Sequence, residues 1–239
     1  MDLVLQEVLL RKEIVKPGLM TWLRFSEGQG QSTYDMSDNR YIARLGSTDG
    51  ADSNDPTWAV EGLSFSADDY VAATISGTIK NIGIAFYIAE AITKSSTGQA
   101  LVSPGNNGAT NRFLGIGDMT ALIADEIICI GDEVNGRSSW TGDGQINAGW
   151  NYIDINWNNT IYQINLNNWA MPVTKTNAPI ALTGNALVIA ALSLSPSKYF
   201  TGKIAYLVMY NRSLSGAERN KNYKAIKQAL LRRGAILNN

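Results

Sequence analysis

Three groups of side chains in this sequence could do chemistry: paired acidic residues, acids and amides in loops, and tryptophans flanked by polar residues. Histidine is absent from the 239 residues. Its absence removes Ser-His and Cys-His catalytic pairs, imidazole zinc sites and the usual proton shuttle near neutral pH. The chemistry open to the chain therefore depends on carboxylates, amides and aromatic rings.

Two pairs of neighbouring acids come nearest to the machinery of a glycoside hydrolase. Such an enzyme needs two carboxylates on one face, about 5 Å apart for retention or about 6.5–9.5 Å apart for inversion. Asp125-Glu126 come before the apolar run 127–130, and Asp132-Glu133 fall at an expected turn. Because successive residues of a strand point to opposite faces, neither pair aligns its acids inward. We expect no catalytic activity, with a hydrolase as the alternative.

Loop residues with carboxylate and amide oxygens suggest a calcium site, because hard cations prefer such ligands. Asp35, Asp38 and Asn39 form one candidate cluster. A second cluster consists of Asp49, Asp52, Asn54 and Asp55. The same residue types are also ordinary turn formers, through hydrogen bonds from backbone to side chain. Both interpretations are open.

Exposed tryptophans are the best candidates for sugar binding, because aromatic faces pack on pyranose rings while polar groups bond the hydroxyls. Trp140 lies in "GRSSWTGDGQ" with Asp143 beside it, and Trp169 follows two asparagines. The alternative for Trp140 is an aromatic side chain folded onto the domain or onto an interface. The remaining tryptophans considered, which lie in strand or motif positions, are predicted to be core residues: Trp22, Trp58 and Trp150.

The composition is that of one globular domain with little net charge. At 239 residues and 25.9 kDa the chain can bury a substantial core. Lys and Arg total 20 against 21 for Asp and Glu, a net charge of −1, so no broad field attracts nucleic acid or anionic lipid. We expect neither as a partner.

No feature of the chain predicts export or membrane insertion. No apolar stretch approaches the roughly 20 residues that span a bilayer, and the start "MDLVLQEVLLRKEIVKPG" carries acids where a secretory signal has only bases. Cys129 is the single cysteine and lies in an apolar run. It is predicted to be a small buried hydrophobe, and a disulfide framework is excluded.

Residues 1–17 are predicted to form a short arm outside the main domain, which spans 18–234. Apolar positions recur through the first ten residues, and Pro17-Gly18 break the pattern. The arm either packs on its own domain or docks on a neighbouring subunit. From Leu19 onward, about a dozen short runs bounded by polar turns predict an all-β fold of two antiparallel sheets face to face.

The segment "WNYIDINWNNTIYQINLNN" is predicted to be a β-hairpin. Ile153, Ile155 and Trp157 fall on one face, opposite Tyr152, Asp154 and Asn156. The asparagines between the two runs tolerate the left-handed backbone of a tight turn.

A single amphipathic helix is predicted at 216–233, near the end of the sequence. Ser215 and Glu218 have the spacing of a capping box. Leu214 occupies the position of a hydrophobic staple, but Arg219 occupies the partner position, so that part of the motif is missing. The apolar residues that recur at helical spacing are Tyr223, Ile226 and Leu230, and Gly234 follows two arginines at the exit.

Four segments resemble laminin-G-like members of the concanavalin A-like lectin/glucanase superfamily, in that family's order. They are "GLMTWLRFSEGQGQSTYDMSDN", "DPTWAVEGLSFSADDYV", "GWNYIDINWNNTIYQINLNN" and "FTGKIAYLVMYNRSLSGAERNKNY". The resemblance implies a jelly-roll sandwich closed by the helix, and a calcium ion at the rim in many relatives. Asp38 and Arg40 stand where the family's loop favours glycines.

Catalytic members of this superfamily carry Glu-x-Asp-x-x-Glu on one strand, and no segment here matches. The arm, single domain and terminal helix also resemble structural or decoration proteins of tailed bacteriophages. The resemblance thus implies a non-catalytic structural and recognition domain of a virion. Its arm would join copies of itself or other virion subunits, and its rim loops would touch cell-surface or mucosal glycans. The alternative is a free lectin-like module or a glycoside hydrolase of the same fold.

Overall fold

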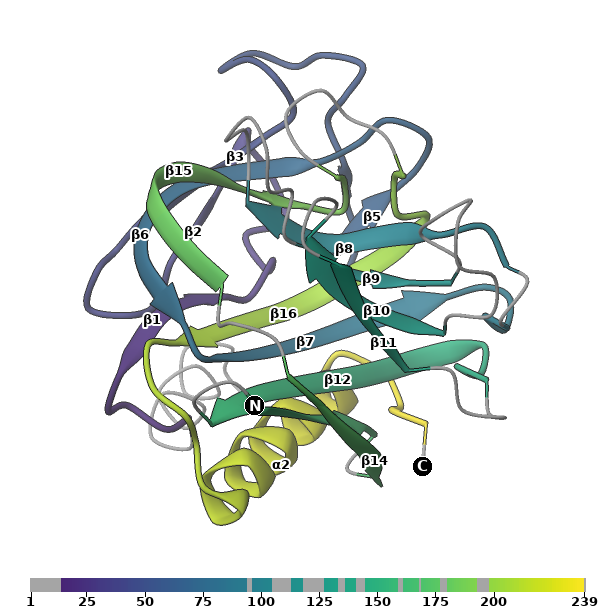
Figure 1. Ribbon diagram of the computed structural model, residues 1–239. Helices are drawn as coiled ribbons and strands as arrows, with labels where there is room; N and C mark the ends of the chain where they lie inside the picture. Colours follow the sequence, from purple (N-terminus) through teal and green to yellow (C-terminus); the bar gives the residue numbers. More distant parts are fainter. Residues whose placement is uncertain are drawn as a thin grey trace.

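The computed structural model describes residues 14–93, 96–104, 113–117, 127–132, 136–140, 145–158, 161–167, 169–176, 180–192 and 198–238. Two antiparallel sheets pack face to face in this part of the chain, and one helix lies outside them (Figure 1). The predicted two-sheet β-sandwich with a C-terminal helix is confirmed. Asp125-Glu126 and Glu133, considered above for hydrolysis, lie outside the described residues.

The first sheet, sheet A, is built around the long strand β16. Its spatial order is β14 (Trp169–Thr176), β13 (Ile161–Leu166), β12 (Gly149–Asn158), β7 (Asn81–Ile88), β16 (Gly202–Tyr210), β5 (Leu63–Phe65) and β4 (Thr57–Trp58), and β1 (Leu19–Leu23) also pairs with β16. The sheet therefore joins strands from both ends of the sequence.

The second sheet, sheet B, has β6 and β15 near its middle. Its spatial order is β11 (Gly136–Trp140), β10 (Ile128–Asp132), β9 (Phe113–Ile116), β8 (Gln99–Pro104), β15 (Ile180–Ile189), β6 (Val71–Ile79), β3 (Ile42–Leu45) and β2 (Ser32–Tyr34). Apolar side chains that alternate along the strands of both sheets fill the space between them.

The predicted hairpin is confirmed as β12 and β13, with Ile155 opposite Ile164. Ile153, Ile155 and Trp157 all point into the core between the sheets. The opposite face of β12 is also buried, because the helix covers it. An alternating strand with both faces buried is expected where a sheet lies between two layers.

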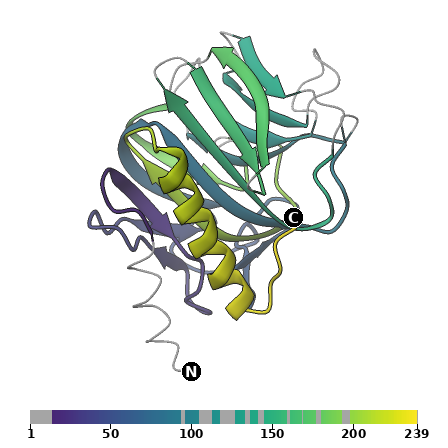
Figure 2. The ribbon, with the colours of Figure 1, turned by 90° about the horizontal axis from the view of Figure 1, so that it is seen from below.

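Helix α2 (Gly216–Arg232) begins and ends close to the predicted residues. Glu218 N donates to Ser215 Oγ and Ser215 N donates to Glu218 Oε2, so the capping box is formed. Gly234 has a φ of 82° just beyond the helix, the left-handed conformation that glycine adopts readily. The helix lies across the outer face of sheet A (Figure 2).

An ion pair joins α2 to the sheet at the position where a staple residue was expected. Arg219 Nε donates to Asp154 on β12, and Arg219 Nη1 donates to Gln163 Oε1 at 2.9 Å. Asn81 Nδ2 donates to the same Asp154 carboxylate at 3.1 Å. The side chains of Asp154 and Arg219 are only 2% and 6% exposed, so the pair is removed from water and holds the first turns of α2 against β12.

The last residues of the predicted arm pack on their own domain. Ile14 and Val15 are buried with the residues beneath α2. Val15 N donates to Asn222 Oδ1 at 3.0 Å, and Tyr210 Oη donates to Val15 O at 2.9 Å. Residues 1–13 lie outside the described part of the chain.

Within the described ranges, no helix combines the length and the apolar character that crossing a bilayer requires.

Candidate functional site

The two predicted sugar-binding tryptophans lie on the edges of different sheets. Trp140 is the last residue of β11, the edge strand of sheet B, and Trp169 is the first residue of β14, the edge strand of sheet A. These two strands contact each other, so they border the same side of the sandwich. The two side chains and Asp143 lie outside what the structure describes, and their role in sugar binding stays a prediction.

The tryptophans predicted to be core residues are buried or partly buried. Trp22 and Trp150 are 0% and 6% exposed and pack beneath α2. Trp58 is partly buried against the main core, and its Nε1 donates to Gly30 O at 2.9 Å.

A polar pocket of about 500 Å³ opens at the rim of the sandwich, and we call it the rim pocket. It lies where β1 begins and where β6 and β16 end, at the left of Figure 1. The lining residues, which come from four separate parts of the chain, are Gly18, Leu19, Met20, Asn39, Tyr41, Ser76, Gly77, Thr78, Lys80 and Asn211. An aromatic ring, two amides, two hydroxyls and one ammonium group thus surround a single cavity.

The Asp35 carboxylate shapes the loop that carries Asn39 and Tyr41. It is 4% exposed. Its Oδ1 accepts from Trp22 N at 2.7 Å and from Ser37 N at 2.9 Å, and its Oδ2 accepts from Ser37 Oγ at 2.6 Å and from Tyr41 N at 3.4 Å. A buried carboxylate with several donors fixes a turn rigidly. Asp35 therefore positions one wall of the rim pocket.

Asn39 is the predicted site residue that the structure brings into the rim pocket. Its Nδ2 donates to Met20 O at 2.7 Å, which ties the loop to β1. Asp38 beside it is exposed. Within the described residues, no group of three or more His, Cys, Asp or Glu side chains is arranged to hold a metal ion. The bonds of Asp35 and Asn39 are those of turn formers, and calcium binding by Asp35, Asp38 and Asn39 stays a prediction.

Two glycines of the rim pocket have backbone conformations that other residues adopt with strain. Gly18 has a φ of 75°, and a Cβ there would lie 2.8 Å from Asn211 Oδ1. Gly77 has a φ of 127°, and a Cβ there would lie 2.8 Å from Met20 Cε. Glycine permits both the positive φ and the close approach, so the shape of the pocket is set by its backbone.

Arg40 keeps the loop conformation that glycine favours. Its φ is 53°, in the left-handed region that costs a non-glycine residue about 1 kcal/mol or more. The sequence departs at this position from the glycine-rich pattern of the family that it resembles, yet the left-handed backbone is present. Bonds from neighbouring residues to Asp35 hold the loop in place.

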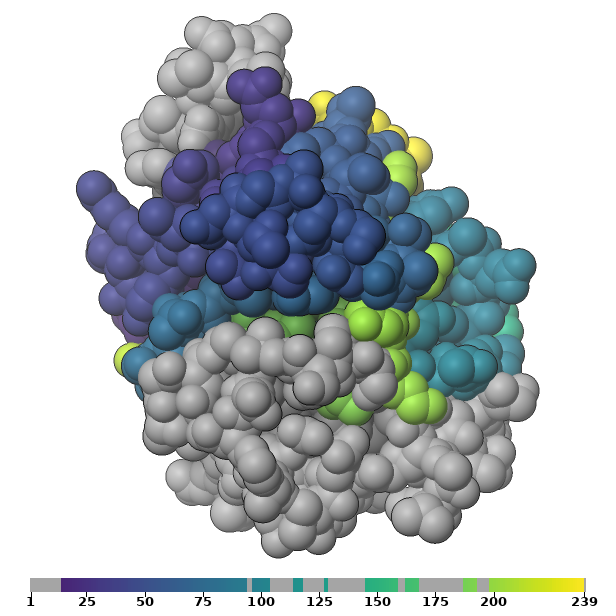
Figure 3. All heavy atoms as spheres, turned by 90° about the horizontal axis from the view of Figure 1, so that it is seen from above, coloured from purple at the N-terminus to yellow at the C-terminus, as the bar shows by residue number. Residues whose placement is uncertain are grey.

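The second predicted acidic cluster is a hydrogen-bonded loop between β3 and β4, on the face shown in Figure 3. Asp52 Oδ2 accepts from Ser47 Oγ at 2.7 Å and from Thr48 N at 3.1 Å, and its Oδ1 accepts from Asn54 N at 2.8 Å. These donors, the Ser47 hydroxyl first, lower the pKa of Asp52 to about 2. Asp55 Oδ2 in turn accepts from Asp52 N at 2.9 Å, so the acids of this loop form its turns.

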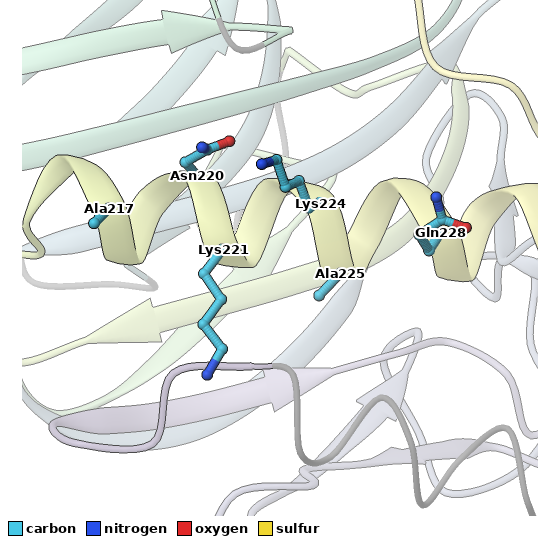
Figure 4. Close-up of a pocket in the computed structure, with 6 residues that line it drawn as sticks. All are labelled: Ala217, Asn220, Lys221, Lys224, Ala225 and Gln228. Atoms are coloured by element: carbon cyan, nitrogen blue, oxygen red, sulfur yellow. The ribbon is translucent and has the colours of Figure 1, made fainter.

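A second hollow of about 390 Å³ lies along α2. Figure 4 shows its lining residues, with Asn220 and Lys224 on one side of the helix and Lys221 on the other. Its lining is Ala217, Asn220, Lys221, Lys224, Ala225 and Gln228, all from the one helix. Among these described residues there is no aromatic ring, so the hollow is less suited to a sugar than the rim pocket.

Sequence reasoning found Asn39 but missed Tyr41, Lys80 and Asn211. No motif or spacing links these positions, because the pocket forms only when four distant segments meet. One weak signal was present: Lys80 and Asn211 are polar residues that directly follow the ends of β6 and β16. Residues at such ends lie at a rim, where ligand sites concentrate.

Comparisons with known proteins show the fold. No protein-family model and no curated protein matches the chain. Domain 4 of AbnA, a GH43 extracellular arabinanase from Geobacillus stearothermophilus in complex with arabinotriose, is 10% identical; the match covers 87% of this chain and 97% of that one, with a TM-score of 0.60. Trypanosoma rangeli sialidase in complex with sialic acid is 13% identical. The match covers 90% of this chain and 34% of the sialidase chain, with a TM-score of 0.58.

A further similar structure is that of botulinum neurotoxin type C, whose cell entry depends on interaction with two ganglioside molecules. It is 12% identical over 88% of this chain and 52% of that one, with a TM-score of 0.59. The chain spans about half of the neurotoxin chain and a third of the sialidase chain. At these identities the likeness defines the fold alone: a sandwich consistent with the concanavalin A-like class, here with a polar pocket at its rim.

Proposed function

We propose that the protein is a non-catalytic carbohydrate-recognition domain that binds a glycan in the rim pocket. The observation that carries this proposal is the pocket itself, which is lined by Tyr41 together with residues that carry amides and hydroxyls. Sugars are recognised by such a combination, in which the ring packs on a pyranose face and the polar groups bond its hydroxyls. The volume of about 500 Å³ falls within the range of ordinary small-ligand pockets.

The neighbours in fold give independent support. Structures similar over most of this chain include an arabinanase domain in complex with arabinotriose and a sialidase in complex with sialic acid. One fold can host many functions, so the proposal depends on the pocket. The structural neighbours are consistent with it.

The same pocket favours binding over hydrolysis. Among the described residues that line it there is no Asp or Glu, whereas most glycosidases need two carboxylates that flank the bond they cleave. The alternative, that the protein is a glycoside hydrolase, predicts that it releases reducing ends from a polysaccharide. Incubation with a polysaccharide panel tests it, and sugar release that is lost on replacing Asp132 and Glu133 would favour that alternative.

The proposal is tested by blocking the pocket. Thr78→Trp places a large side chain in the rim pocket, whereas Thr74→Trp places the same side chain outside it, at another exposed position of β6. On a glycan array, wild type and Thr74→Trp should bind the same glycans. Thr78→Trp should bind these glycans at least about tenfold more weakly, because the added side chain excludes them from the polar contacts.

Two outcomes would contradict the proposal. A flat array with folded wild-type protein would exclude glycan recognition. Binding that survives Thr78→Trp but is lost in Trp140→Ala would move the site to the side of the sandwich bordered by β11 and β14.

We further propose that the domain is a structural subunit of a larger particle, such as a phage virion, which it joins through residues 1–17. Ile14 and Val15 pack on their own domain beneath α2, which leaves the part of the arm before them for this contact. The preceding apolar positions supply a surface for a neighbouring subunit. Deletion of residues 1–13 leaves Ile14 and Val15 in place and should abolish oligomers seen by light scattering; unchanged oligomers would exclude this role.

A further inference from the structure

We infer that the rim pocket selects sugars that carry a carboxylate, such as uronic or sialic acids, through the ammonium group of Lys80. This inference rests on the proposed function and names the class of glycan. Lys80 is the one charged residue among the described residues that line the pocket. An ammonium group among neutral amides and hydroxyls favours an anionic ligand over a neutral one.

Lys80 has no acidic partner among the ion pairs of the described residues. The ion pairs of the described residues are Arg44–Asp49, Lys203–Glu61, Arg212–Glu218 and Arg219–Asp154, and none includes Lys80. Within the described part of the chain its positive charge is therefore available to a ligand.

The backbone of Lys80 is held firmly at the edge of the cavity. Its N donates to Tyr210 O at 2.7 Å, and its O accepts from Trp157 N at 2.8 Å. These bonds tie the residue to sheet A between β6 and β7. Because Lys80 is also half-buried, an ion pair formed there is screened less than one on an open surface.

The other lining groups suit the rest of a sugar acid. Asn211 and Asn39 offer amide groups, Ser76 and Thr78 offer hydroxyls, and Tyr41 offers a ring. A carboxylate carries one negative charge, whereas a phosphate monoester carries about 1.5 to 2 at neutral pH. A single ammonium group with neutral neighbours therefore matches a carboxylate better than it matches a phosphate.

The test compares each acid with its own neutral form. Calorimetry would measure binding of trigalacturonate against its methyl ester, and of sialyllactose against its methyl ester. Wild type should bind at least one acid about tenfold or more tightly than its neutral form, as expected for a hydrogen bond to a charged group. Lys80→Gln should remove this preference, Lys80→Arg should keep most of it, and added salt should weaken it. Lys224→Gln, on the exposed face of α2, is the matched control and should behave as wild type.

Either of two outcomes would overturn the inference. These are equal affinity for the acid and neutral forms, or a preference that persists in Lys80→Gln. If neutral glycans bind in the pocket and are lost in Thr78→Trp, the proposed function stands and only the choice of ligand is wrong. Circular dichroism of each variant separates a lost contact from a lost fold.

Discussion

The helix-covered face of sheet A and the rim pocket contain similar polar side chains, but these side chains have different roles in the two regions. Beneath α2 lie Asp154, Arg219, Asn81 and Asn156, all at most 6% exposed. They bond one another and the backbone: Leu214 N donates to Asn156 Oδ1 at 2.7 Å, and Asn156 Nδ2 donates back to Leu214 O at 3.1 Å. In the rim pocket, by contrast, Asn39, Asn211 and Lys80 line an open cavity.

The difference shows that residue type does not mark a site, whereas surroundings do. Burial raises the pKa of Asp154, and the adjacent Arg219 guanidinium opposes that rise. A perturbed pKa is often a sign of a functional site. Here the carboxylate is 2% exposed and is paired with Arg219 between helix and sheet, so it serves to dock the helix.

The largest expected effect comes from removing the buried ion pair between α2 and sheet A. Asp154→Ala leaves the Arg219 charge buried without its partner and should lower the free energy of unfolding by about 3–5 kcal/mol. The double variant Asp154→Leu/Arg219→Met removes both charges and should recover most of the loss. Urea unfolding measures both. The partly exposed pair Lys203–Glu61 is the control, and Glu61→Gln should cost about 1 kcal/mol or less. If Asp154→Ala lowered the free energy of unfolding by no more than Glu61→Gln does, the buried pair would not be what docks the helix.

A smaller, pH-dependent effect is expected at the start of α2. Arg212 and the Ser215 backbone N–H lower the pKa of Glu218 to about 2. Because this folded-state pKa lies below the unfolded value of 4.5, the stabilisation is present above pH 4.5 and is lost as the pH falls towards about 2.

Glu218→Gln should therefore cost about 1 kcal/mol near neutral pH, and the difference from wild type should vanish near pH 2. Thermal unfolding across this pH range measures it. Glu90→Gln, at an exposed bend, is the control for the substitution itself and should be as stable as wild type near neutral pH. A constant difference between Glu218→Gln and wild type from neutral to acid pH would exclude the charged form of Glu218 as its source.

The smallest expected effect lies in the loop of the rim pocket, where substitutions test whether the backbone is strained. Arg40→Gly relieves the strain of a positive φ and should raise the free energy of unfolding by about 0.5 kcal/mol, with glycan binding unchanged. Asp38→Gly, at a neighbouring position without a positive φ, should instead lose about 0.5 kcal/mol. Equal effects of the two substitutions in urea unfolding would show that backbone strain at Arg40 is not significant.

Much of the architecture could be predicted from local sequence. The β12–β13 hairpin follows from a two-residue alternation, and the start of α2 follows from Ser215 and Glu218, because both depend on interactions between residues close in sequence. The role of Arg219 could not be predicted in this way. Its position lacks a staple residue, and only the packing of α2 on β12 reveals the partner.

The candidate site was predictable only in part. Asn39 stood out as a loop amide, but its neighbours in the pocket come from residues 18–20, 76–80 and 211, and only the pairing of β1 with β16 and the course of β6 bring them together. The sequence by itself determined the class of fold, the helix and the exclusion of histidine chemistry, since these depend on composition and short-range pattern. Tertiary structure alone decided which polar residues are enclosed beneath α2 and which face a cavity, because exposure depends on contacts between segments far apart in the chain.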